Sequence, residues 1–128
     1  MRGFSLVESL VAIIIFLIII VALGPLLITG IKTAKINEMR DETLYKVNKV
    51  LEHLISKPYD DSCLDVGTNN TCQNDNGCCG DESGNSNIGW TVLNGSENNT
   101  KKIEVTGVFN YLGHTGQVKI GYIKGNWP

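Results

Sequence analysis

A single acidic residue at the edge of a long apolar run constrains this chain more than any other feature. Between Arg2 and Lys32 the sequence carries a single Asp, Glu, Lys or Arg, which is Glu8, and the uncharged apolar run extends from there to Ile31. The run is longer than the apolar core of a cleaved signal sequence, which spans about 7–15 residues. As a helix it is long enough to cross about 30 Å of hydrocarbon. An acid within such a segment costs a few kcal/mol, so Glu8 is a candidate functional residue that needs a cationic partner.

A second pattern follows the apolar run. Apolar residues recur at spacings of three and four, and they are Leu44, Val47, Val50, Leu51, Leu54 and Ile55. This period predicts an amphipathic helix with one buried face. The helix should end at Lys57-Pro58, because a residue before proline avoids helical dihedral angles. Within the apolar part, Gly24 and Pro25 predict either a kink or a local opening. We therefore expect one helix from Phe4 to Ser56.

Three later segments alternate apolar and polar side chains, as β-strands do. They are 88–92, 103–111 and 118–122, and turn-forming residues separate them. They predict a three-stranded antiparallel sheet with one apolar face turned to the helix. The expected fold class is therefore α+β, a long helix packed on a small antiparallel sheet that occupies residues 88–128. Residues 58–87 show no period and predict a connecting loop.

All four cysteines fall in that loop, at Cys63, Cys72, Cys78 and Cys79. Such clustering predicts two disulfides in an oxidising compartment. A bond between Cys78 and Cys79 is disfavoured, because adjacent Cα atoms lie only about 3.8 Å apart. Two pairings stay open: Cys63–Cys78 with Cys72–Cys79, or Cys63–Cys79 with Cys72–Cys78. The spacing does not match zinc or iron–sulfur sites, so we expect no metal.

Two further patterns in the polar stretches are weak indications of calcium binding and of glycosylation. Asn74-Asp75-Asn76-Gly77 resembles part of a calcium loop, but Cys72 and Ser83 stand where its first acidic ligand and its Glu belong. Plain turn chemistry is the simpler interpretation. Three triplets match the glycosylation acceptor pattern, which arises easily by chance in an Asn-rich chain; they begin at Asn69, Asn94 and Asn98.

The chain carries little that points to catalysis or to nucleic acid. His53 and His114 have no acid and nucleophile at an interpretable spacing, and no glycine-rich phosphate loop occurs. We therefore expect no enzyme, no catalytic residue and no cofactor. The formal net charge is −2, and no basic residue lies between Lys57 and Lys101. This balance disfavours a nucleic-acid partner.

The residues around Glu8 resemble the N-terminus of type IV pilin and pseudopilin precursors. The family pattern is a basic residue, Gly, Phe, Ser or Thr, Leu, an aliphatic residue and Glu, followed by Leu-Val-Ala in an apolar helix. Here the residues are Arg2-Gly3-Phe4-Ser5-Leu6-Val7-Glu8 and then Ser9-Leu10-Val11-Ala12. The resemblance implies cleavage by a prepilin peptidase between Gly3 and Phe4, and N-methylation of Phe4. It also implies subunit assembly through Phe4 and Glu8, with the carboxylate of Glu8 meeting the freed amine of another subunit.

The resemblance and the patterns together divide the chain into five parts. They are a leader at 1–3, a transmembrane and assembly helix at 4–30, a headgroup helix at 31–57, the loop at 58–87 and the sheet at 88–128. Within the family, the chain is most similar to minor pilins of the pilus-modification type and to I-type minor pseudopilins. The implied location is the inner membrane as a single-pass protein, and then an extracellular or periplasmic filament.

The function implied by the resemblance is a structural subunit, a minor pilin of a type IV pilus-like filament. Its implied partners are other pilin or pseudopilin subunits, the prepilin peptidase, the inner-membrane assembly platform, and membrane lipid before assembly. Three alternatives stay open: a major pilin that forms the filament body, a minor pseudopilin of a type II secretion system, and a single-span anchored binding module that never polymerises. The first two belong to the same class of protein, and the third does not.

Overall fold

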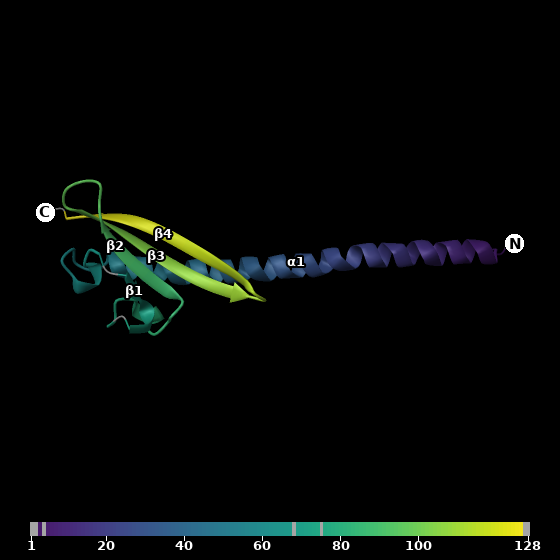
Figure 1. The fold of residues 1–128 in the computed structure, drawn as a ribbon, viewed down its shortest axis with the longest axis horizontal. Helices are drawn as coiled ribbons and strands as arrows, with labels where there is room; N and C mark the ends of the chain where they lie inside the picture. Colours follow the sequence, from purple (N-terminus) through teal and green to yellow (C-terminus); the bar gives the residue numbers. More distant parts are fainter. Residues whose placement is uncertain (1–2, 4, 68, 75, 127–128) are drawn as a thin grey trace. The chain divides into compact units, whose positions relative to one another are not determined.

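A computed structural model describes residues 3, 5–67, 69–74 and 76–126. Over these residues the regular elements are one helix, α1 (Leu6–Ile55), and the strands β1 (Asn69–Thr71), β2 (Ile88–Asn94), β3 (Thr100–Tyr111) and β4 (His114–Gly125) (Figure 1). Single 3-10 turns interrupt the loop at Ser62–Leu64, Cys72–Asn74 and Gly80–Glu82. The chain divides between Asn37 and Glu38 into two compact units. The first is the N-terminal part of α1, and the second holds the rest of that helix, the loop and the sheet.

The sheet has four strands in the order β1-β2-β3-β4, and each neighbouring pair is antiparallel. The sequence predicted three strands, so this prediction was wrong by one. The additional strand, β1, lies in the segment for which no strand was expected. Its residues Asn69, Asn70 and Thr71 are all polar, so no alternation marks them. Pairing with β2, opposite Thr91, Trp90 and Gly89, makes this segment a strand.

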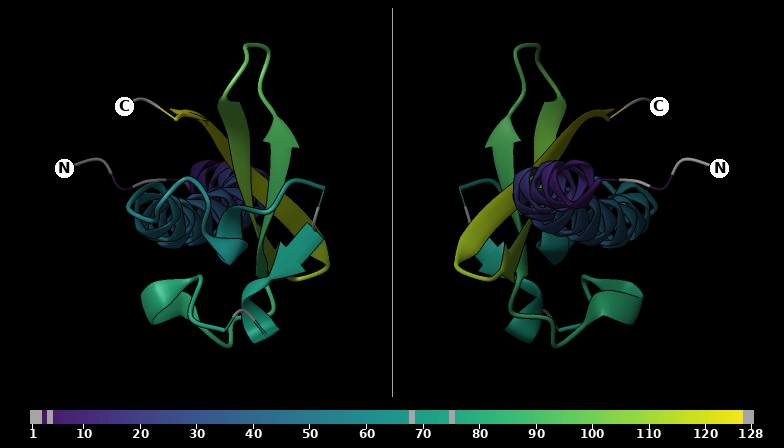
Figure 2. Two further views of the ribbon diagram at one scale, coloured as in Figure 1. Left: turned by 90° about the vertical axis from the view of Figure 1, so that its left-hand side faces the viewer. Right: turned by 90° about the vertical axis from the view of Figure 1, so that its right-hand side faces the viewer.

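The C-terminal part of α1 packs on one face of the sheet, which gives an α+β fold. Viewed along the helix, the strands of the second unit lie to one side of it (Figure 2). The helix buries Val47, Val50, Leu51 and Leu54, the three-and-four spacing that the sequence predicted. Leu44 belonged to the same predicted face but is 42% exposed. It borders a shallow hollow lined by Tyr45 and Ile120 and lies outside the core.

Alternation along the strands supplies the other half of the core. The buried strand residues that share one core with the buried residues of α1 are Ile88, Trp90, Val92, Ile103 and Val105. The register aligns them, because Trp90 pairs with Val105 and Val92 pairs with Ile103. Residues that face one another across strands share a face of the sheet. The apolar side of this sheet is therefore continuous from β2 to β3.

A glycine on β3 allows the helix to approach the sheet closely. A Cβ placed on Gly107 would lie 2.5 Å from Cγ2 of Val47 and 2.6 Å from Cγ2 of Thr43. Ordinary contacts between carbon atoms are about 3.5–4.0 Å. Any side chain at this position would therefore push α1 and β3 apart.

Candidate functional site

The first turn of α1 is held by a serine cap. The side-chain oxygen of Ser5 accepts a hydrogen bond from the backbone N–H of Glu8 at 3.1 Å. Its carbonyl accepts from the N–H of Ser9, also at 3.1 Å. Ser5 and Glu8 thus occupy the two key positions of a Ser-x-x-Glu capping box. The sequence contains this signature, but from the sequence we considered Glu8 only as an acid that needs a cationic partner and did not recognise the capping box.

The proposed cleavage point lies directly before this cap. Gly3 is exposed and precedes the helix, whereas Phe4 lies outside the described residues. Cleavage and methylation at this point stay predictions. Glu8 is exposed on the first turn, where its carboxylate is accessible to another chain.

The apolar part of α1 has no surface to pack against within its own unit. The segment is long and apolar enough to cross a membrane, and none of it is buried. Its exposed side chains include Leu10, Ile13, Phe16, Leu17 and Ile20. A signal sequence would pass the same test of length and composition. An apolar surface of this extent needs lipid or other protein around it.

The helix continues through Gly24 and Pro25, which lie inside α1. Proline has no N–H, so Pro25 cannot donate to the carbonyl of Val21. One turn later, the hydroxyl of Thr29 donates to the carbonyl of Pro25 at 2.9 Å. The predicted kink or opening stays a prediction. Because one backbone hydrogen bond is missing, this turn should cost less to open than a fully hydrogen-bonded turn.

Two lysines from the sheet donate to backbone carbonyls at the C-terminal end of α1 and just beyond it. The ammonium group of Lys124 on β4 donates to the carbonyl of Ile55 at 2.6 Å and to the carbonyl of Lys57. Lys101 on β3 donates to the carbonyl of Tyr59 at 2.8 Å and lies 4.3 Å from the centre of its ring. Cations at a helix C-terminus satisfy carbonyls that lack helical partners. Our sequence reasoning missed both contacts.

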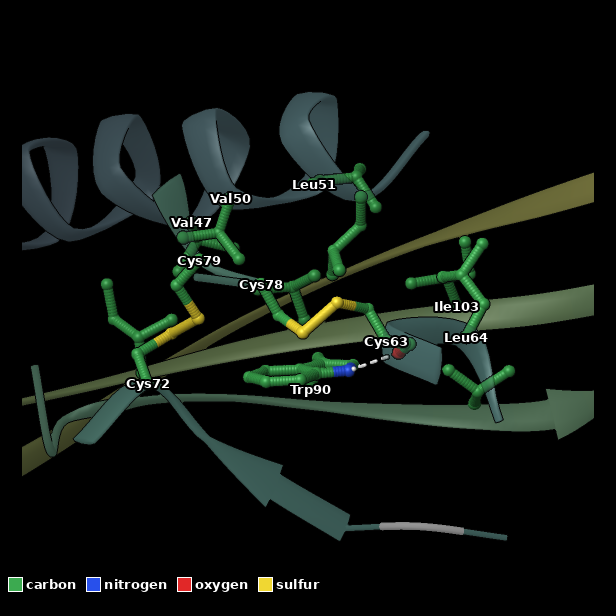
Figure 3. Packing of buried hydrophobic residues seen from close by; sticks show 14 residues of the cluster. Val47, Val50, Leu51, Cys63, Leu64, Cys72, Cys78, Cys79, Trp90 and Ile103 are labelled. Carbon is green, nitrogen blue, oxygen red and sulfur yellow. Dashed lines mark hydrogen bonds between the residues drawn. A yellow bond between two sulfur atoms is a disulfide. The ribbon is translucent and has the colours of Figure 1, made fainter. Parts of the chain in front are cut away.

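Two disulfides build the loop, and they resolve the pairing that the sequence left open. Cys63 bonds Cys78, and Cys72 bonds Cys79, with Cα–Cα distances of 5.7 and 5.6 Å. All four cysteines lie in the core cluster beneath α1 (Figure 3). The indole N–H of Trp90 donates to the carbonyl of Cys63 at 2.9 Å, which ties the first disulfide to β2 (Figure 3).

The loop also contacts polar residues of α1. His53 is partly buried and hydrogen-bonds through Nε2 to the carbonyl of Gly77 at 3.2 Å. Lys49 lies 4.0 Å from a carboxylate oxygen of Asp81. Hydrogen bonding to Tyr45 and, more weakly, the charge of Asp81 raise the pKa of Lys49 above its usual value. These contacts join the loop to α1, whereas both disulfides lie within the loop itself.

The outer face of the sheet carries a small charge cluster. Glu104 accepts from Lys119 at 3.0 Å and from Lys102 at 3.1 Å. Hydrogen bonding, first to Lys119 and then to Lys102, lowers the pKa of the Glu104 carboxyl. The cluster joins β3 to β4 and shows no geometry suited to catalysis.

Within the described part of the chain, no three His, Cys, Asp or Glu side chains are grouped as a metal site. Asp75 of the calcium-like stretch lies outside the described residues. Comparisons with family models, with characterised proteins and with solved structures found no match. What the structure brings together is an exposed apolar helix with an accessible acid at its start, and a disulfide-bonded α+β unit.

Proposed function

We propose that this protein is a structural subunit of a type IV pilus-like filament, and a minor pilin in particular. It is stored in the inner membrane as a single-pass protein, cut after Gly3 by the prepilin peptidase and methylated on Phe4. The assembly platform then transfers it from lipid into the filament, where its apolar helix packs against those of other pilin subunits. The headgroup faces the outside, where its disulfides persist.

One observation carries this proposal: a lone accessible carboxylate, Glu8, stands in the first turn of an apolar helical segment in which no residue is buried. Once that helix enters a bundle, an unpaired carboxylate at its end would cost several kcal/mol. Cleavage after Gly3 would create a cationic amine on Phe4 at the same level of the helix. Pairing that amine with Glu8 of a neighbour offsets both costs and sets the register between subunits.

The restraints within the headgroup also support the proposal, because a filament subunit must stay folded outside the cell. Its core is small, and small domains of this kind need additional restraints. Two disulfides and the lysine contacts at the C-terminal end of α1 supply them.

The test must separate the charge of Glu8 from its role in the cap. Glu8→Gln keeps a residue that fits the capping box but removes the charge. Ser5→Ala removes the cap and keeps the charge. The protein is expressed with its assembly machinery, and the amount of each variant in sheared filaments is measured against the amount in the membrane.

If the charge pairs with the amine, Glu8→Gln and Glu8→Ala both accumulate in the membrane, and Ser5→Ala assembles nearly as well as the unchanged chain. If Glu8→Gln enters filaments normally, the pairing is refuted. The proportion of this chain in wild-type filaments separates a minor subunit from a major one. Its presence only in the membrane, with Met1 to Gly3 retained, would identify an anchored module that does not polymerise.

A further inference from the structure

The turn between β3 and β4 has a backbone that its sequence does not favour. Tyr111 pairs with His114, so Leu112 and Gly113 form a two-residue turn. Both residues have positive φ, 48° at Leu112 and 81° at Gly113. Turns of this kind select Asn, Asp or Gly, because a Cβ in the left-handed region is strained. A leucine at such a position is an outlier.

The rest of the described chain follows the rule that Leu112 breaks. Of the eight described residues with positive φ, five are glycines, two are asparagines and the last is Leu112. Packing within the chain does not account for the leucine, since 67% of it is exposed. Backbone strain of this kind is concentrated at functional sites, and at Leu112 it coincides with an exposed apolar side chain.

The end of the hairpin around Leu112 is unusually free of charge. Residues 105–118 contain no Asp, Glu, Lys or Arg, and the nearest charged residues along the sequence are Glu104 and Lys119. Val108 adds a second partly exposed apolar side chain, 38% exposed, on the same hairpin. Val108 borders a hollow that is also lined by the ion-paired Glu42 and Lys46 of α1, so the uncharged contact is confined to the tip of the hairpin at Leu112.

Two kinds of apolar partner would fit, and the chemistry favours protein over lipid. Even a fourteen-carbon acyl chain gives only marginal membrane binding, so one leucine without neighbouring cations would give far less. A complementary protein surface must itself be uncharged and apolar. Residues 9–31 of α1 form a surface of that type, uncharged and exposed throughout its apolar side chains.

Building on the filament function proposed above, we propose that Leu112 is an assembly contact. It packs against the apolar N-terminal helix of a neighbouring filament subunit, a helix of the type that residues 9–31 form in this chain. The left-handed turn holds the side chain outward at the tip of the hairpin. The strained turn destabilises the free subunit, and the contact that Leu112 makes in the filament compensates for this cost.

Site-specific cross-linking tests the partner directly. A photoreactive benzoyl-phenylalanine is placed at position 112 of the full chain, and filaments from cells that assemble it are irradiated. Mass spectrometry then maps the attached peptide. Attachment to the apolar helix of a filament subunit supports the proposal. Attachment to lipid, to a headgroup or only within the same chain overturns it.

Substitution of Leu112 provides a second test, because the proposal predicts that the subunit becomes more stable while its incorporation into filaments falls. Leu112→Asn relieves the strained turn, so the melting temperature of the full chain in detergent should rise by a few degrees. Its incorporation into filaments should fall about tenfold or more, the loss expected from one leucine that is no longer buried. The matched control is Ile123→Thr, which removes an apolar side chain of 58% exposure from the other end of β4.

The control should assemble like the unchanged chain. Normal incorporation of Leu112→Asn would overturn the contact, as would an equal loss in Ile123→Thr. A fall in the melting temperature of Leu112→Asn would show that the leucine serves the fold, and would also overturn it. The amount of the unchanged chain in filaments tests the proposed function separately. If the unchanged chain is present there, these results overturn the Leu112 contact and leave the filament function intact.

Discussion

The close approach of α1 to β3 at Gly107 leads to a prediction whose size follows from the coordinates. In Gly107→Ala the new Cβ would lie 2.5 Å from Val47 and 2.6 Å from Thr43, and neither contact is with the end of a long flexible side chain. Restoring ordinary carbon contacts needs a shift of about 1 Å between helix and sheet. Overpacking of this kind costs about 1–3 kcal/mol.

The control for this substitution is Gly121→Ala on β4. A Cβ at Gly121 would lie 3.7 Å from its nearest neighbour, the carbonyl of Ile103, which is an ordinary contact. Both variants restrict the unfolded chain to a similar degree, a gain of about 0.4–1 kcal/mol. The difference between them therefore isolates the collision with the helix.

The assay is thermal unfolding of the full chain in detergent, followed by near-ultraviolet circular dichroism with the disulfides intact. We expect Gly107→Ala to melt about 4–24 °C below Gly121→Ala, from 1–3 kcal/mol at about 4–8 °C per kcal/mol. Gly121→Ala should melt at or slightly above the temperature of the unchanged protein. Equal melting temperatures for the two variants would refute the packing of α1 on this part of the sheet.

Three further predictions concern the headgroup. Replacing Cys63 and Cys78 together by Ser opens a link of 15 residues and should lower the free energy of unfolding by about 3 kcal/mol, measured by urea denaturation. Lys124→Met removes the donor to the last carbonyls of α1; a loss of about 1–3 kcal/mol is expected in the same assay, and no loss would contradict the cap. Because Lys119 lowers the pKa of Glu104, this ion pair stabilises the fold above the ordinary glutamate pKa of about 4.3, and its contribution disappears as the pH falls through the lowered pKa. Lys119→Met should therefore unfold more readily than the unchanged chain at pH 7 but equally readily below the folded pKa of Glu104; a difference that persists in acid would contradict the linkage.

Local periodicity accounts for the parts of the fold that the sequence predicted. The helical face at Val47, Val50, Leu51 and Leu54 and the alternation in β2 and β3 reflect spacings within single elements. The strand β1 escaped prediction because only its pairing with β2 makes it a strand. The disulfide pairing stayed open for a similar reason, since spacing alone allows two solutions.

Of the contacts at the two ends of α1, the one between near residues could be predicted from the sequence and the one between distant residues could not. Ser5 and Glu8 are three residues apart, so the cap at the start of α1 was readable as a capping-box signature. Lys124 and Ile55 are 69 residues apart, and no local pattern could associate them. The strained turn at Leu112 lay hidden for a further reason, because leucine is a residue that turn signals do not include.

The mass of the mature chain tests the central claim most directly. The protein is recovered from sheared filaments and from the membrane of the same cells, and the N-terminal peptide of each fraction is sequenced by mass spectrometry. We expect the filament fraction to begin at Phe4 with a methylated amine, the cationic group that Glu8 of a neighbour would meet. A filament fraction that keeps Met1 to Gly3, or whose terminal amine is blocked by a neutral group, would contradict that pairing.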